Sequence, residues 1–453
     1  MTEILRKKLS DSAAARWTVL CVVAFTMFCG YFVTDVMAPL MEMLGEEFGW
    51  SAEEYGIFNL AYGLLNVALF MLIISGIILD KIGVRLTGIG SCILMIIGCF
   101  LKYYAVSKSF EGEIFGLRTQ VFLASIGFAI FALGIESAGI TVTKVIVRWF
   151  KGKEMALAMG IQVSVARLGT TLAMSATLPL ANYFGSPSRP ILFGLAALCI
   201  GLIAYLVFCV MDKKLDGTVP EEENSEPFKV KDIGSIISSK GFWLLALLCV
   251  LFYSAIFPFL KYAVSFMINK YGVDPNFAGI LPSILPIGAI FLTPLFGGIY
   301  DAKGKGATIM MIGAILLIFV HFMFSLPILN HWVFAAILMV VLGFAFSLVP
   351  SAMWPSVPKI IDENKVGTAY GLIFWVQNIG LSLVPYIIGR VLDNYGIIGT
   401  KITEKGNEVP VYDYTYPSII FTCFGVLALF TAVLLKREDK KKGYGLELPN
   451  IKK

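Results

Sequence analysis

The sequence has little charge for its length. Only 15% of its 453 residues are Asp, Glu, Lys or Arg, whereas 58% are hydrophobic, and the mean hydropathy is +0.81. A soluble domain usually has about 25% charged and 45–50% apolar residues. A large soluble α/β protein would need polar interruptions in its strands, and these are absent. The composition therefore indicates a polytopic membrane protein that faces lipid over most of its surface.

Several kinds of chemistry lack the residues they require. The two histidines, His321 and His331, have no metal-ligand spacing, and the 8 cysteines include no C-x-x-C pair, so we expect no metal and no cofactor. No ATP-binding P-loop and no nucleophile–base constellation occurs, which argues against an enzyme. The net charge of +5 comes from short basic clusters, and no long basic stripe with interleaved aromatic residues occurs, so nucleic acid is not an expected partner.

Long apolar runs are what the sequence has in abundance. A spanning helix needs about 20 apolar residues, and such runs lie at about 17–40, 56–79, 86–106, 117–147, 154–180, 187–211, 241–268, 277–300, 306–328, 331–358, 365–390 and 415–435. We therefore predict an all-α polytopic membrane protein with twelve transmembrane helices. Its parts are a six-helix bundle (1–211), a polar linker (212–240), a second six-helix bundle (241–436) and a basic tail (437–453).

The basic residues predict the orientation in the membrane. Lys and Arg gather at the N-terminus, after the second and fourth runs, in the linker and in the tail, while the loop from Glu42 to Glu54 carries acidic residues and no basic one. Since short cytoplasmic loops carry an excess of Lys and Arg, both termini and the linker are expected in the cytoplasm. The first run is long enough to span and has no cleavage site after it, so it is expected to be a retained helix.

One loop pattern occurs twice. Gly76, Asp80, Lys81, Gly83 and Arg85 follow the second run as G-x-x-x-D-K-x-G-x-R, and a similar frame follows the eighth run, with Asp301 at the aspartate position. We expect Gly76 to allow close helix approach and Gly83 a tight turn. Asp80 is expected to meet a cation or a helix N-terminus and so to latch the two halves when the cytoplasmic side is closed. A duplicated six-helix unit with this loop resembles the major facilitator transporters.

Two charges lie deep inside the apolar runs. Glu136 is 12 residues before Arg148 and Arg167 is 14 residues after Lys153, so they lie about 18 and 21 Å from the cytoplasmic turn at 1.5 Å per residue. Inserting such a charge costs about 2.5–3.5 kcal/mol, so both should face a polar interior. The remaining charged residues in the runs are expected near the ends, where long side chains snorkel: Lys144 at the inner end, and Asp35, Lys102, Arg118, Lys261 and Arg390 at the outer end.

Glu136 and Arg167 allow two interpretations. One is a structural salt bridge between the fourth and fifth spans. The other is a clamp for a zwitterion, with Arg167 on a carboxylate, which its fork can bind through both oxygens, and Glu136 on an amine or carrying a proton. Aromatic and polar residues that can complete such a pocket are Tyr62, Asn66, Tyr253, Phe257, Trp354, Trp375, Gln377 and Asn378.

The segments ALGIES, WFKGKE, ARLG and FYSAIFPFLKY resemble the lysosomal dipeptide uniporter family known as major facilitator superfamily domain-containing protein 1. The likeness extends over most of the spans. It implies that Glu136 and Arg167 flank the substrate site with Tyr62 beside them, and that the substrate is a dipeptide held by its two ends. Prolines in the second half (Pro258, Pro282, Pro286, Pro294, Pro350 and Pro355) are expected to break or bend helices.

Two departures from this family bear on localisation. Glu3-Ile4-Leu5-Arg6 does not fit an acidic dileucine signal, and no N-x-[ST] sequon occurs. These features favour a bacterial relative in the inner (plasma) membrane and argue against an accessory glycoprotein subunit. A monomer is expected. The expected partners are the lipid bilayer and a dipeptide or amino-acid-like solute. Two alternatives remain open: a proton-coupled carboxylate or organic-anion transporter, and a non-transporting membrane receptor or scaffold.

Overall fold

The computed structural model describes residues 12–150, 153–216, 230–328, 330–362, 365–403 and 406–450. The long helices of the first half are α1 (Ala13–Asp35), α3 (Ala52–Ala68), α4 (Met71–Ser107), α5 (Thr119–Phe150), α6 (Met155–Phe184) and α7 (Ser188–Asp216). Those of the second half are α9 (Lys240–Tyr271), α11 (Ile280–Lys303), α12 (Gly306–Ser325), α13 (Trp332–Ile360), α14 (Val366–Val391) and α15 (Thr415–Lys442). The short helices are α2 (Met41–Phe48), α8 (Val230–Ile237) and α10 (Pro275–Ala278).

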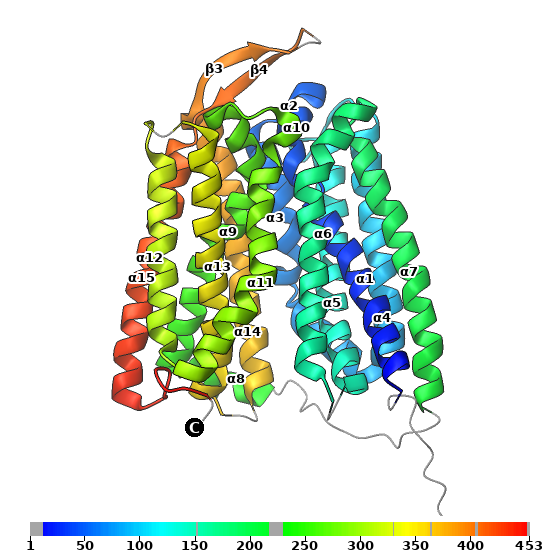
Figure 1. Cartoon of the computed structure of the whole chain (residues 1–453). Coiled ribbons are helices and arrows are strands. Elements are labelled where there is room, and N and C mark those ends of the chain that lie inside the picture. The colour runs from blue at the N-terminus through cyan, green and yellow to red at the C-terminus, as the bar shows by residue number, and fades with distance from the viewer. Residues whose placement is uncertain are drawn as a thin grey trace, which may run out of the picture.

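The long helices form two bundles that stand side by side, with α1 and α4–α7 on one side and α9, α11–α13 and α15 on the other (Figure 1). The seam between the two halves is built mainly by α3 packing on α14 and by α6 packing on α11. Such packing in a membrane depends on close contact between backbones rather than on the hydrophobic effect. The predicted two-bundle all-α architecture is therefore confirmed.

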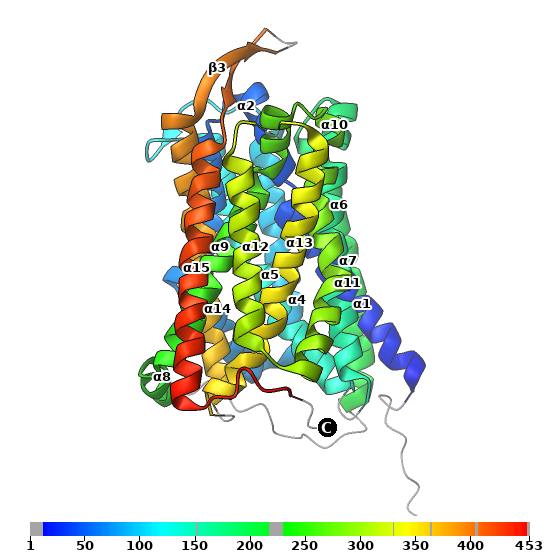
Figure 2. The same ribbon diagram turned by 60° about the vertical axis from the view of Figure 1, so that its left-hand side comes forward.

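The two ends of the molecule differ in their extra elements. Strands β3 (Ile397–Ile402) and β4 (Glu408–Tyr412) form a hairpin that projects beyond α2 and α10 (Figures 1 and 2). Strands β1 (Glu113–Ile114) and β2 (Leu117–Arg118) lie in the loop between α4 and α5 at the same end, which we call the hairpin end. The opposite end holds α8, Gly83 and the C-terminal segment, and we call it the motif end.

The second predicted span is not one helix. Eleven helical segments of the described residues are long and apolar enough to cross a membrane, and α3, with 17 residues, is too short to be among them. The helix stops at Ala68, and Phe70 takes a left-handed conformation (φ 51°) before α4 begins at Met71. Helical geometry is interrupted again at Gly83 (φ 80°, ψ 171°). The second span is therefore α3 with Met71–Ile82, and the third is Val84–Ser107.

Two further expectations need correction. The prolines within α9, α11 and α13 do not break these helices, for example Pro258 inside the continuous α9, and the expectation that they bend them stays a prediction. A membrane helix tolerates the missing N–H because neighbouring groups can satisfy the freed carbonyl.

The last helix also runs past residue 436 to Lys442, with Glu438 and Asp439 buried against the bundle. Much of the predicted linker, residues 217–229, lies outside the described residues.

Glycines allow the two halves to touch backbone to backbone along α3 and α14. A Cβ added at Gly56 would lie 2.9 Å from the Pro385 carbonyl oxygen, and one added at Gly389 would lie 2.1 Å from the Ala52 carbonyl oxygen. A Cβ at Gly63 would lie 1.6 Å from Ser382 Oγ. No larger residue fits at these crossings without separating the helices. Small residues thus set the spacing of the seam.

Candidate functional site

The carboxylate of Glu136 lies in the interior of the first half. Helix α5 carries it 14 residues from its motif end at Phe150, which is about 21 Å along the axis. The hydroxyl of Tyr62 on α3 donates a hydrogen bond of 2.7 Å to Glu136 Oε1. The Tyr62 ring packs on Phe128, with centroids 5.2 Å apart. Residue Glu136 as a whole is half-buried.

The guanidinium of Arg167 is surrounded by aromatic rings from both halves. Helix α6 carries it 12 residues from Met155, about 18 Å from the motif end and close to the depth of Glu136. Its Cζ lies 5.7 Å from the ring centre of Tyr31 on α1, 5.5 Å from that of Phe257 on α9 and 5.4 Å from that of Phe346 on α13. A cation held over aromatic faces gains about 0.5–2 kcal/mol from each ring.

Glu136 and Arg167 do not form an ion pair in this structure. Within the described part of the chain, the Arg167 side chain has the three ring contacts and no carboxylate partner. The Glu136 carboxylate has Tyr62 as its hydrogen-bond partner. The hypothesis of a purely structural salt bridge therefore has no support in this conformation. An acid and a base at one depth are each left with unused hydrogen-bonding capacity.

Tyr253 supports the aromatic cover of Arg167 rather than touching it. Its ring stacks on Phe257 one turn further along α9, with centroids 5.5 Å apart. Its hydroxyl accepts a hydrogen bond of 3.1 Å from Trp354 Nε1 on α13, and Tyr370 donates to the Trp354 carbonyl at 3.0 Å. This chain of contacts fixes α9 against α13 and α14. Tyr253 is therefore placed behind the ring of Phe257.

Trp375 and Asn378 lie on the seam between α14 and α3, without direct contact to Glu136 or Arg167. Trp375 Nε1 donates a hydrogen bond of 2.9 Å to the carbonyl of Val67, and its ring stacks on Phe70 at 5.1 Å. The Val67 carbonyl lies where α3 breaks, so Trp375 satisfies a group that a continuous helix would have used. Asn378 is buried, and its Oδ1 has no hydrogen-bond partner. A buried acceptor of this kind needs a donor from water or from a ligand.

Three charged residues that were expected to snorkel to the surface are shielded inside the protein. Lys102 is 0% exposed, and its ammonium donates to the Val33 carbonyl at 2.9 Å and lies 4.6 and 4.5 Å from the rings of Phe128 and Phe131. Asp35 and Lys261 form a mostly buried ion pair of 2.7 Å. The expectation that these side chains snorkel to the surface is therefore wrong, whereas the expectation that Glu136 and Arg167 are the only charges at their depth stays a prediction. Depth follows from residue number, but the direction of a side chain around its helix does not.

The residues of the repeated loop make contacts within their own half. Asp80 pairs with Lys144 of α5 at 2.5 Å, and Arg85 pairs with the buried Asp212 of α7 at 3.6 Å. Gly83 makes the predicted turn with its positive φ, and the Lys81 side chain is exposed. The expected close helix approach at Gly76 is wrong for this conformation, because a Cβ there would meet nothing within 4 Å.

The second copy of the loop is covered by the C-terminal segment. Asp301 accepts a hydrogen bond of 2.7 Å from Asn450 Nδ2, and the backbone of Asn450 donates to the Asp301 carbonyl at 3.1 Å. Gly304 turns with φ 70° directly beneath Glu447 and Leu448. Both copies of the loop therefore turn at a glycine with positive φ, but Asp80 pairs with a lysine whereas Asp301 accepts from an asparagine.

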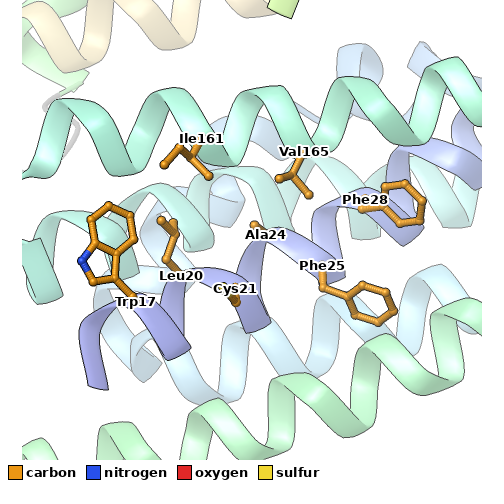
Figure 3. A pocket seen from close by; sticks show the side chains of 8 residues that line it. All are labelled: Trp17, Leu20, Cys21, Ala24, Phe25, Phe28, Ile161 and Val165. Atoms are coloured by element: carbon orange, nitrogen blue, oxygen red, sulfur yellow. The ribbon is translucent and has the colours of Figure 1, made fainter. Parts of the chain in front are cut away.

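A cavity between α1 and α6 has no charged residue in its lining. It has a volume of about 500 Å³ and opens between α1 and α6, lined by Trp17, Leu20, Cys21, Ala24, Phe25, Phe28, Ile161 and Val165 (Figure 3). Its walls are apolar side chains, which suit lipid chains and offer nothing to a charged solute. Among the described residues, no cluster of three or more His, Cys, Asp or Glu is arranged to hold a metal ion.

Comparison with known sequences identifies the family. A family profile described as Major Facilitator Superfamily matches residues 23–385. The chain belongs to the major facilitator superfamily. This assignment agrees with the twelve-span fold, the repeated loop and the two bundles, and it makes the protein a transporter homologue embedded in the membrane through many passes.

Individual relatives in this superfamily differ in what they carry. The lysosomal dipeptide transporter MFSD1 of Danio rerio is 30% identical over 346 residues, which cover 73% of this chain and 69% of that protein. The probable nitrate transporter NarT of Staphylococcus epidermidis is 23% identical, over 72% of this chain and 74% of that protein. The resemblance to the lysosomal dipeptide transporters is therefore confirmed.

A solved structure supports the fold independently. A bacterial homologue of the human lysosomal transporter Spinster, solved in an inward-facing and unoccupied conformation, superimposes with a TM-score of 0.73 at 16% identity. The match covers 95% of this chain and 98% of that structure. At this identity the likeness concerns the fold alone.

The sequence did not point to Tyr31, Phe346, Thr170 or the pairing of Asp35 with Lys261. A signal was present on two helices, because Tyr31 and Asp35 on α1, and Phe257 and Lys261 on α9, are spaced four residues apart. Residues at this spacing lie on one helical face. An aromatic residue and a charge repeated in this way on two helices favour a common surface.

Proposed function

We propose that this protein moves small zwitterionic solutes across a membrane by alternating access, and that dipeptides are the most suitable substrates. The observation that supports the proposal is the state of the two deep charges. Glu136 and Arg167 lie at similar depth, carry opposite charge and are not paired with each other. A solute with a free amine and a free carboxylate offers each of them a partner.

Each end of a dipeptide finds suitable chemistry in this arrangement. The guanidinium of Arg167 can bind a carboxylate through two parallel hydrogen bonds, and the rings of Tyr31, Phe257 and Phe346 lie around it. Glu136 takes the ammonium group and is oriented for this by the hydroxyl of Tyr62. The unpartnered Oδ1 of Asn378 is available to a peptide N–H. Trp375 and Tyr253 support the walls of the site.

The transport cycle follows from the seam. In the state described here the halves are tied together at the hairpin end, so the solute would enter and leave at the motif end. We propose that the motif end faces the cytoplasm, because its loops carry an excess of Lys and Arg. The repeated loop would form contacts between the halves after the motif end closes. We infer a monomer in the inner (plasma) membrane, without a cofactor and without an accessory subunit.

The experiment that tests this function is counterflow in proteoliposomes loaded with a panel of dipeptides, tripeptides, amino acids and dicarboxylates. Wild type should exchange dipeptides, and Arg167→Ala should reduce the exchange at least 100-fold while the protein keeps its elution profile and melting temperature. Arg390→Ala is the matched control, because Arg390 is an exposed arginine at the hairpin end. Wild-type exchange by Arg167→Ala would refute the assigned role.

A second candidate is an anion transporter, in which Arg167 binds the anion and Glu136 carries a proton. The observation in its favour is that Arg167 has no carboxylate partner of its own among the described residues. The same panel separates the two candidates, because exchange of dicarboxylates without dipeptides would exclude the dipeptide assignment. Imposing a pH gradient in these vesicles distinguishes proton symport from uniport. A receptor or scaffold would exchange none of the solutes.

A further inference from the structure

Three helices carry two functional layers that are one turn apart. Helices α1, α6 and α9 all run from the motif end to the hairpin end, and each contributes one residue to each layer. The lower layer is the group around the guanidinium: Tyr31, Arg167 and Phe257. Four, three and four residues further along lie Asp35, Thr170 and Lys261, which form the upper layer. Residues at these spacings share a helical face, so the upper layer lies directly beyond the lower one.

The upper layer is a connected polar cluster. Lys261 Nζ lies 2.7 Å from Asp35 Oδ1 and donates to the Thr34 carbonyl at 3.2 Å. The hydroxyl of Thr170 donates to the second carboxylate oxygen of Asp35 at 2.9 Å. The side chains of Asp35 and Lys261 are 14% and 16% exposed. The cluster is therefore satisfied by protein groups and largely shielded from water.

The ion pair crosses the seam, since Asp35 belongs to the first half and Lys261 to the second. We propose that the Asp35–Lys261 pair is the gate on the hairpin-end side of the binding site, and that it positions the aromatic cover over Arg167. Phe257 lies one turn below Lys261 on the same rigid helix, so the pair that holds Lys261 against α1 also holds Phe257 against α6. Movement of α9 away from α1 breaks the Asp35–Lys261 ion pair and at the same time withdraws Phe257 from the guanidinium of Arg167.

The energetics make this pair suitable for a two-state gate. Removing one partner leaves a charge that is largely buried and unpaired, which is strongly unfavourable, whereas both charges regain water once the hairpin end opens. Neutralising either partner should therefore shift the equilibrium toward the open hairpin end. Lys102 of α4 donates to the Val33 carbonyl near the same α1 terminus and ties α1 to its own half. The moving partner is thus Lys261.

Distance measurements between spin labels test the gate directly. Tyr183 on α6 and Tyr416 on α15 are exposed residues at the hairpin end of opposite halves. Both are replaced by labelled cysteines in a chain whose 8 native cysteines are removed. Asp35→Asn and Lys261→Met should each add a population at longer distance, and the exchange Asp35→Lys with Lys261→Asp should remove it. Thr170→Val should shift the population in the same direction by a smaller amount.

The control is Arg118→Gln, which removes an ion pair of 3.0 Å with Glu54 at the same end but within one half. It should leave the distances unchanged. Identical distributions in wild type and in all three single variants would overturn the proposal, and so would an equal shift in Arg118→Gln. The proposal builds on the proposed function only in assigning Arg167 to the binding site. Because the labels report on opening without any solute, an unchanged distance is distinguishable from a wrong substrate.

Discussion

The two ends of the seam are held together in different ways. At the hairpin end polar groups of one half bind polar groups of the other: Lys261 pairs with Asp35, Lys401 and Asn269 bind Glu42, and Asp393 accepts from the backbone N–H groups of Ala52 and Glu53. At the motif end the corresponding contacts stay within one half: Asp80 with Lys144, Arg85 with Asp212, and Asp301 with Asn450.

This difference shows that the structure represents a state in which the hairpin end is closed. Glycines and polar pairs hold the hairpin end shut, whereas the loop residues of the motif end have partners that do not oppose separation of the halves. Even the salt link between Arg16 and Glu154 connects α1 to the start of α6 inside the first half. A hydrogen bond from its own backbone N–H, with help from Arg16, lowers the pKa of the exposed Glu154 carboxyl. The motif end can therefore open at little cost.

The strongest test of this difference is to add one methyl group at each end. A Cβ at Gly389 would lie 2.1 Å from the Ala52 carbonyl oxygen, while a Cβ at Gly76 would meet nothing within 4 Å. We expect Gly389→Ala to force α3 and α14 apart and to destabilise the described state by about 1–3 kcal/mol, as overpacking does. Gly76→Ala should leave its stability unchanged or slightly raise it, since alanine favours a helix over glycine.

The measurement is the melting temperature of both variants in detergent, together with the hairpin-end distance between the labels on Tyr183 and Tyr416. Gly389→Ala should melt lower and show the longer distance. If Gly76→Ala keeps its melting temperature but loses transport, then the motif end does close during the cycle. Equal melting of the two variants would contradict the contrast between the ends.

A smaller effect is expected from Glu42→Gln. Glu42 on α2 accepts hydrogen bonds from Ser265 and from Asn269 (2.8 Å), and it pairs with Lys401 of the hairpin at 3.3 Å. Hydrogen bonds to a charged group contribute about 1.5–3 kcal/mol, and exposure of Lys401 to solvent reduces its share. Hydrogen exchange of β3 and β4 should therefore become about 10-fold faster, as measured by mass spectrometry. Glu113→Gln, an exposed acid at the same end, should leave exchange there unchanged, and equal protection in both variants would show that Glu42 does not hold the hairpin.

The smallest effect is expected at Trp375. Replacing it by Phe removes the 2.9 Å hydrogen bond to the Val67 carbonyl and keeps a ring against Phe70. One neutral hydrogen bond contributes about 0.5–1.5 kcal/mol, so the midpoint of thermal unfolding should fall slightly, and the break at Phe70 should exchange its backbone hydrogens faster. Trp332→Phe, at an exposed position, serves as the control. A fall equal to that of the control would mean that Trp375 does not stabilise the break.

The depth of the site could be predicted from the sequence, because helices are rigid rods with a fixed rise per residue. Counting from the basic turn placed Glu136 and Arg167 at one level, and the helix bounds agree. The direction of side chains around each axis could not be predicted in this way. Lys102 was expected to snorkel to the surface but points inward, because its partner, the Val33 carbonyl at the end of α1, is far away in sequence.

The break in the second span could not be predicted from the sequence either. Hydropathy is continuous through Leu69 and Phe70, and Phe70, which takes the left-handed conformation, stacks on Trp375 from the other half. The packing of the C-terminal segment on Gly304 and Asp301 was missed for a similar reason. The basic composition of the tail predicts a solvated end, but its few apolar residues, such as the buried Leu446, pack on the second bundle.

The central claim is that Glu136 and Arg167 hold the two ends of one solute, and binding of end-capped dipeptides tests it most directly. In wild type, acetylating the amine or amidating the carboxylate should each weaken competition for binding of a labelled dipeptide by about 10- to 100-fold, the value of one charged hydrogen-bonded contact. In Glu136→Gln, acetylating the amine should weaken competition little further, while amidating the carboxylate should keep its full effect. In Arg167→Gln, amidation should have little further effect and acetylation should keep its full effect. The account would be contradicted if each cap weakened competition equally in wild type and both variants, or if neither cap weakened it in any of the three proteins.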